Sequence, residues 1–91
     1  MIDEALSNAV ITYVGYDTDT AIPRRHPDRI AHGGLRRAVL AIVAEVDREQ
    51  PGDQGLWVWG AEVSKRVGEK HPQLSVEALD ALTALVTFDW R

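Results

Sequence analysis

Cysteine is absent from the sequence, which excludes a disulfide framework and a thiolate metal site. No apolar run approaches the roughly 20 residues of a membrane-spanning helix, and the N-terminus is acidic, unlike a secretory signal. We therefore expect a cytoplasmic protein without a membrane segment. A length of 91 residues with 45% apolar residues is ordinary for a globular protein, so we treat residues 1–91 as a single domain.

Catalytic motifs are missing as well. The sequence contains no nucleophile elbow and no phosphate-binding glycine loop. His26 and His32 lack the i, i+4 spacing of a helical metal pair. Asp17 and Asp19 are typical of an Asp-Thr-Asp turn rather than of paired catalytic carboxylates. We therefore expect no enzyme activity, no metal and no cofactor.

Charge is distributed unevenly along the chain, whose net charge is −4. Five of the ten basic residues are arginines in residues 24–37, and acidic segments flank them on both sides. These arginines either pair with acidic side chains of the protein itself or contact a phosphate or an acidic binding partner. The five residues are Arg24, Arg25, Arg29, Arg36 and Arg37.

The clearest predicted element is a core helix over residues 35–46. Its large apolar residues recur with the spacing of one helix face, and three alanines between them raise helix propensity. Ile42 and Val43 lie at the centre of that face. Two glycines precede the helix, and Pro51 follows it.

Three further helices are predicted. A short helix begins at Pro27, because proline suits the first helical position. Another short helix spans 61–67 and stops at Gly68. The last helix begins after Ser75, a favoured N-cap residue, and continues to about residue 86 with apolar residues at helical spacing.

Three segments have the composition of strands. Residues 9–16 are β-branched and aromatic, residues 56–59 alternate and are bulky, and residues 86–90 alternate between apolar and polar side chains. The first and last of these strands lack a partner next to them in the sequence. We therefore expect them to pair with each other, which would remove two exposed edges.

The order of elements from residue 35 is that of a winged helix-turn-helix domain. Residues 34–43, GLRRAVLAIV, resemble the opening helix of PadR-type regulators, and residues 60–67, GAEVSKRV, resemble their second helix. The segment from Leu74 and Ser75 resembles their third. The sequence thus predicts an α+β fold, mainly helical, with three helices in winged-helix-like order and a small antiparallel sheet from the N- and C-terminal strands.

Two functions follow from these features. The resemblance implies a winged-helix, DNA-binding transcriptional regulator of bacterial type. From residue 75 to residue 90, however, the presumed reading helix has three acids and no Lys, Arg, Asn or Gln, the residues that read base edges. We therefore rank first a small protein-interaction module, of accessory, adaptor or immunity type, and expect no sequence-specific DNA binding. A homodimer is also compatible with these features.

Tryptophans are the other candidates for a binding surface. Trp57 and Trp59 face the same side of the predicted strand, where they either pack on the core helix or act as interface anchors. Tryptophan and arginine dominate binding hot spots, which makes the arginines the other half of such a surface. The candidate partner-binding residues are Arg24, Arg25, Arg29, Arg36, Arg37, Trp57 and Trp59.

Overall fold

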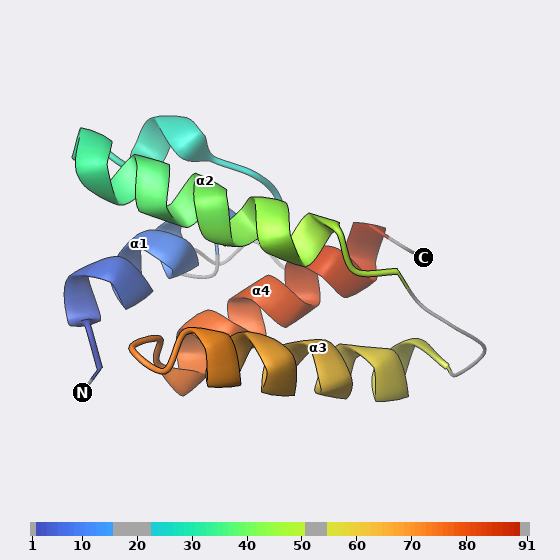
Figure 1. The fold of residues 1–91 in the computed structure, drawn as a ribbon. Helices are drawn as coiled ribbons and strands as arrows, with labels where there is room; N and C mark the ends of the chain where they lie inside the picture. The colour runs from blue at the N-terminus through green and yellow to red at the C-terminus, as the bar shows by residue number, and fades with distance from the viewer. Residues whose placement is uncertain (1, 16–22, 51–54, 90–91) are drawn as a thin grey trace.

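The computed structural model describes residues 2–15, 23–50 and 55–89. Within these ranges the chain forms helices and no strand, so the predicted α+β fold and its sheet are wrong. None of the described helices is long and apolar enough to cross a membrane. The elements are α1 (Glu4–Val14), the 3-10 helix η1 (Pro27–Arg29), α2 (Gly33–Asp47), α3 (Leu56–Lys70) and α4 (Val76–Asp89), as Figure 1 shows.

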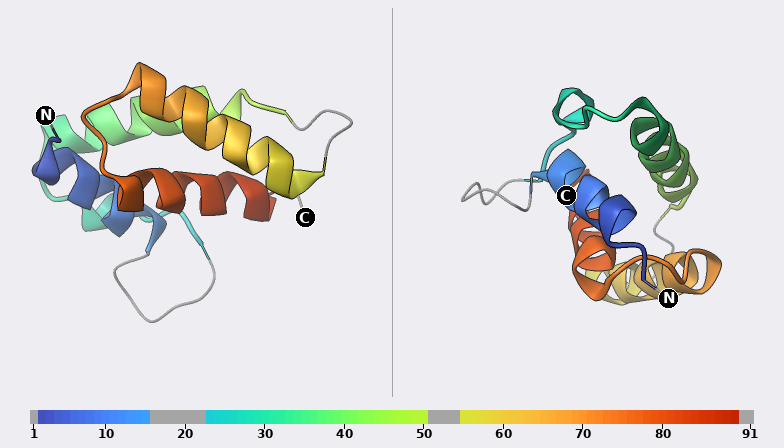
Figure 2. Two further views of the ribbon diagram at one scale, coloured as in Figure 1. Left: turned by 90° about the horizontal axis from the view of Figure 1, so that it is seen from below. Right: turned by 90° about the vertical axis from the view of Figure 1, so that its left-hand side faces the viewer.

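Helix α4 is the centre of the arrangement. The helices α1, α2 and α3 all pack on it, and α1 also packs on α2. In Figure 1 α4 is seen between α2 and α3, and the side view in Figure 2 shows α2, α3 and α4 at the corners of a triangle. Helix α3 packs chiefly on α4, which makes α3 an edge helix of the bundle.

The predicted strand over residues 9–16 is helix α1 up to residue 14; residue 16, like the predicted turn at 17–20, lies outside the described residues. The helix begins earlier, because the Asp3 carboxylate caps it by accepting a hydrogen bond of 3.0 Å from the Leu6 N–H. It ends at Gly15, whose φ of +89° favours glycine. Packing overrides the β propensity of this segment, since Leu6, Val10, Tyr13 and Val14 are all buried.

The predicted core helix is confirmed as α2. Four of its apolar residues are buried at the predicted spacing: Val39, Ile42, Val43 and Val46. The glycines Gly33 and Gly34 form its first turn rather than preceding it. His32 caps the helix, because its Nδ1 accepts a hydrogen bond of 3.1 Å from the Leu35 N–H. The short helix predicted to begin at Pro27 is confirmed as η1, a 3-10 helix that ends at Arg29.

The predicted strand over 56–59 and helix over 61–67 are one continuous helix, α3, which also runs through Gly68. Trp59, Val63 and Val67 are buried with i, i+4 spacing. This segment therefore follows the periodicity of a helix and not the alternation of a strand. Gly60 permits this packing, since a Cβ there would lie 3.0 Å from Thr87 Cγ2 of α4. A glycine inside a helix costs about 1 kcal/mol of stability relative to alanine, and the close packing of α3 on α4 at Gly60 offsets this cost.

The start of α4 agrees with the prediction, and its end does not. Ser75 caps the helix, because its Oγ accepts a hydrogen bond of 3.2 Å from the Ala78 N–H. The predicted strand over 86–90 is wrong up to residue 89, because the helix continues that far and buries Val86 against the core. Trp90 lies outside the described residues. The expected pairing of the first and last segments as strands is therefore wrong: the two segments are helices, and α1 packs on α4.

Candidate functional site

Two of the five candidate arginines are engaged in holding the fold together. The Arg25 guanidinium donates two hydrogen bonds, of 2.9 and 2.8 Å, to the carboxylate of Asp47 at the end of α2. The Arg36 guanidinium donates twice, at 3.1 and 2.9 Å, to the carbonyl oxygen of Ile30. These contacts connect the segment before α2 to the helix itself.

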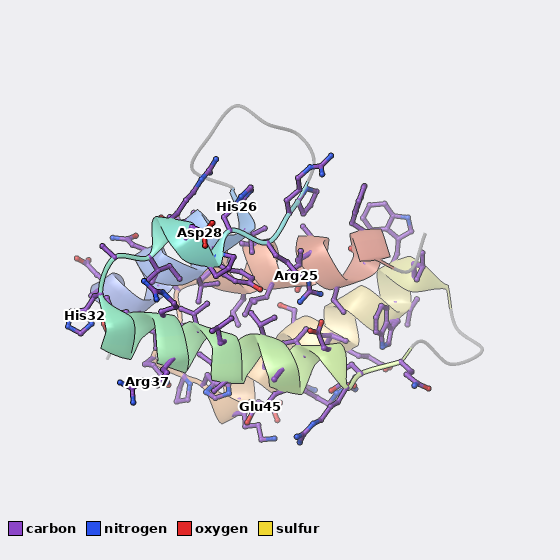
Figure 3. The ribbon with its side chains drawn as sticks, turned by 90° about the horizontal axis from the view of Figure 1, so that it is seen from above. Arg25, His26, Asp28, His32, Arg37 and Glu45 are labelled. Atoms are coloured by element: carbon purple, nitrogen blue, oxygen red, sulfur yellow. The ribbon has the colours of Figure 1, made fainter. Side chains whose placement is uncertain are left out.

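The other three candidate arginines point into solvent. The side chains of Arg24, Arg29 and Arg37 are exposed and make no hydrogen bond or ion pair within the described part of the chain. Figure 3 shows Arg25 and Arg37 on opposite sides of α2. The arginines that are adjacent in sequence are therefore not gathered into one basic patch.

The two candidate tryptophans lie in opposite environments, one in the core and one in solvent. Trp59 is 1% exposed and belongs to the core, whereas Trp57 is 89% exposed. Residues two apart on a helix point about 200° apart, so the prediction that both face one side is wrong. Val58, next to Trp57, is 54% exposed. We call Trp57 and Val58 together the Trp57 surface.

The Trp57 surface lies at the start of the edge helix. Gly60 approaches Thr87, so the first turns of α3 lie against the last turns of α4, which carry the exposed ring of Phe88. The start of α2, with Arg36 and Arg37, lies at the opposite end of the molecule in Figures 1 and 2. The structure therefore does not bring the candidate arginines of α2 and the candidate tryptophan together.

A charged bridge between α2 and α3 was not predicted from the sequence. His71 Nε2 lies 2.6 Å from Glu45 Oε2, and the Arg66 guanidinium donates hydrogen bonds of 3.0 and 2.8 Å to the Glu49 carboxylate. An open groove runs beside these pairs and is lined by Glu45, Glu49, Arg66, Val67, Glu69 and Lys70. No sequence pattern indicates the bridge, because its partners are 26 and 17 residues apart.

The electrostatics of this bridge follow from its geometry. The hydrogen bond from His71 lowers the pKa of the Glu45 carboxyl below its ordinary value. The hydrogen bond to Glu49 raises the pKa of the Arg66 guanidinium. The two contacts connect α2, and the residues just after it, to the C-terminal half of α3.

The helix expected to read DNA occupies the centre of the bundle. Helix α4 buries a stripe of apolar residues in the core, and its exposed residues include Glu77 and Asp80. Among the described residues, no group of three or more His, Cys, Asp or Glu side chains is arranged to hold a metal ion.

The described residues define a small all-α domain in which three helices surround α4 and one edge helix exposes a tryptophan. Comparison of the chain with protein-family models, with curated proteins and with solved structures finds no match.

Proposed function

We propose that this protein is a non-enzymatic protein-interaction module of the cytoplasm, of accessory, adaptor or immunity type, and that the Trp57 surface is where it docks. The observation that carries the proposal is the 89% exposure of Trp57. A tryptophan ring offers about 150–250 Å² of area for burial, and tryptophan is enriched among the residues that dominate binding energy.

The rest of the domain supports this role. Trp57 is beside a second exposed apolar residue, Val58, rather than isolated among charges. The core is complete without either side chain, since Trp59, Val63 and Val67 fill the face of α3 that meets α4. The exposure of Trp57 therefore costs the fold no packing and leaves the ring available to a partner.

The alternative, a winged-helix transcriptional regulator, has less support. Its reading helix would be α4, whose exposed surface includes Glu77 and Asp80. Carboxylates near phosphates are repulsive, and the chain places no Lys or Arg within α4 to offset them. The solvent-facing arginines Arg24, Arg29 and Arg37 lie outside α4 and offer contacts to phosphates rather than to bases.

The test compares three forms of the full chain as bait in an extract of the source cells. We expect one or more proteins to be retained by the wild type and to be lost, by at least tenfold, with Trp57→Ala. The matched control is Val76→Ala, which removes a side chain that is 73% exposed at the other end of the α3–α4 pair. Equal retention by Trp57→Ala and wild type, or retention of nothing together with a monomeric bait, would contradict the proposal.

A further inference from the structure

The outer face of α2 is a second exposed helix face, on a different helix from the Trp57 surface. The buried residues of α2 pack toward α1 and α4. On the opposite side of the helix, four exposed residues with i, i+4, i+7, i+11 spacing lie within about 60° of one another around the axis. They are Arg37, Ala41, Ala44 and Arg48. Leu40, which is 40% exposed, lies beside them, and we call the five residues the α2 surface.

The two arginines of the α2 surface have no acidic partner in the described part of the chain. The side chains of Arg37 and Arg48 make no hydrogen bond or ion pair within residues 2–15, 23–50 and 55–89. In Figure 3 Arg37 projects outward from α2, on the side away from Arg25. Arg48 acts on Glu45 through its field alone, as the smallest of the causes that lower the pKa of that carboxyl. Both guanidinium groups are therefore available to a carboxylate from outside.

The acids closest to these arginines in the sequence are already engaged. Helix α2 contains two carboxylates, and each contacts a side chain from another segment. Glu45 Oε2 lies 2.6 Å from His71 Nε2, and the Asp47 carboxylate accepts hydrogen bonds of 2.8 and 2.9 Å from Arg25. In a chain whose net charge is −4, the α2 surface thus presents positive charge at both of its ends.

A second copy of this chain does not fit the α2 surface. Antiparallel packing with the two surfaces in register places Arg37 of each copy against Arg48 of the other, and parallel packing places each arginine against itself. Like charges that face each other across an interface are repulsive. The charge pattern therefore selects a different partner.

The centre of the α2 surface argues against a nucleic acid. Arg37 and Arg48 are separated by about 16 Å along the helix axis. The side chains between them, on Leu40, Ala41 and Ala44, carry no hydrogen-bond donor. Double-stranded DNA has one negative charge per about 1.7 Å of its axis, so most of the phosphates beside this surface would lie against apolar side chains.

We propose that the α2 surface binds an acidic amphipathic helix of another protein. Two carboxylates on one face of that helix, three turns apart, pair with Arg37 and Arg48. Small or apolar residues between the carboxylates pack on Leu40, Ala41 and Ala44, where the alanines allow the two helix axes to approach to about 8 Å. This site goes beyond the proposed function, because it gives the domain a second partner on a helix that does not carry Trp57.

The affinity of such a contact follows from its size and its charges. One helix face is small beside the roughly 1,200 Å² that stable complexes bury. Exposed ion pairs contribute little affinity and are screened by salt, but they fix the register of the two helices. We therefore expect reversible binding in the micromolar range that weakens as the salt concentration rises.

The probe is a synthetic, fluorescein-labelled helical peptide with glutamates at i and i+11 and with alanine and leucine on the face between them. Fluorescence anisotropy with the full chain should give micromolar binding. A peptide of the same composition, with its second glutamate moved to the opposite side of the helix, should bind at least tenfold more weakly. Failure of the wild-type chain to bind the first peptide, or equal binding of the two peptides, overturns the proposal.

Charge variants of the full chain test the two arginines. Arg37→Gln and Arg48→Gln should each weaken binding of the matched peptide several-fold. The matched control is Lys65→Gln, an equal charge change at an exposed position of α3, which should have no effect. Circular dichroism of each variant establishes that helix content is retained. Binding that is insensitive to both arginine variants overturns the proposal.

The centre of the surface has a test of its own. Ala44→Gln places a longer side chain between the two helices and should weaken binding several-fold, whereas a contact held by the arginines alone would not change. Ala61→Gln, the same substitution at an exposed position of α3, is the control. If a randomised duplex binds more tightly than the peptide and depends on both arginines, the surface belongs to a nucleic acid and the proposal is wrong. A dimer that Arg37→Gln dissociates would likewise assign the surface to a second copy.

The outcomes separate this inference from the proposed function. Trp57→Ala should leave binding of the peptide unchanged, because Trp57 lies on α3. A chain that fails to bind the peptide and still captures a partner through Trp57 contradicts the α2 site alone. A chain that binds the peptide and captures nothing through Trp57 contradicts the Trp57 docking site and leaves the α2 site standing.

Discussion

The buried hydroxyl of Ser7 in α1 accepts a hydrogen bond of 2.9 Å from the backbone N–H of Ser75, 68 residues away. Ser75 in turn caps α4, so one side chain of the first helix fixes the residue that begins the last. The Asp3 N–H donates to the carbonyl oxygen of Gln73 at 2.7 Å in the same turn. The N-terminal helix therefore closes the bundle at the connection between α3 and α4.

Removal of the Ser7 hydroxyl should destabilise the protein. Ser7 is 2% exposed, so Ser7→Ala leaves the Ser75 N–H without its partner in a part-buried position. We expect a loss of about 1–3 kcal/mol in the free energy of unfolding, measured by urea denaturation. The control is Asn8→Ala, at an exposed position of the same helix, which should change the midpoint little. Equal midpoints for Ser7→Ala and the wild type would show that this bond is energetically neutral.

The cap of α4 makes a separate prediction. Ser75→Ala removes the oxygen that accepts from the Ala78 N–H and should cost about 1 kcal/mol. Ser75→Asp supplies another good N-cap acceptor and should be close to neutral. Thermal unfolding followed by circular dichroism distinguishes the two variants. If both melt with the wild type, the side chain of Ser75 does not stabilise the start of the helix.

Truncation of Ile42 should be the most damaging change in α2. The side chain is 4% exposed at the centre of the buried face, so Ile42→Ala should cost about 2–5 kcal/mol. A small domain has roughly 5 kcal/mol or little more in total, so we expect this variant to be largely unfolded at 37 °C. Leu40→Ala, at a position that is 40% exposed on the same helix, is the control and should melt near the wild type. If Leu40→Ala melted at a lower temperature than Ile42→Ala, the result would contradict the buried face observed for α2.

Acid should weaken the bridge between α2 and α3. The pKa of Glu45 is lowered from its ordinary value of 4.5, chiefly by the hydrogen bond with His71. A carboxyl whose pKa is lower in the folded state stabilises the fold above the unfolded value, and that stabilisation is lost as pH falls through the folded pKa. Glu45→Gln should therefore lose less stability than the wild type as pH falls below 4.5.

Urea midpoints measured at several pH values test this difference. Glu69→Gln removes another carboxylate that lines the same groove, and it should keep the pH dependence of the wild type. Parallel curves for the wild type and Glu45→Gln would show that the contact between Glu45 and His71 does not contribute to stability.

Sequence-specific DNA binding should be absent. Duplex binding draws much of its affinity from Lys and Arg, and α4 contains neither. We expect weak binding at low salt that Arg24→Gln and Arg29→Gln reduce and that substitutions in α4 leave unchanged. Fluorescence anisotropy with a randomised duplex pool at physiological salt measures this. Enrichment of one sequence with sub-micromolar affinity would instead favour the transcriptional regulator.

Several features of this protein follow from the sequence alone. The core helix is encoded locally, because the spacing from Val39 to Val46 fits a helix and no strand. Ser75 and Pro27 mark helix starts by their own chemistry, as a side-chain acceptor and as a fixed backbone angle. The absence of Lys and Arg from residues 75–89 is likewise a property of the sequence, whatever the fold.

Tertiary packing decided the rest. Residues 9–14 and 86–89 have β-branched or alternating patterns that suit a short strand as well as a helix. The packing of α1 on α4, with Val10, Val14 and Val86 buried in the core, selects the helix. The same choice separates the tryptophans, since a period of two would put Trp57 beside Trp59 and a period of 3.6 puts them on opposite sides. The contact of Gly60 with α4 turns Trp59 inward and leaves Trp57 in solvent. Partners such as Ser7 and Ser75 meet only after the chain has folded, and for that reason no local pattern predicts them.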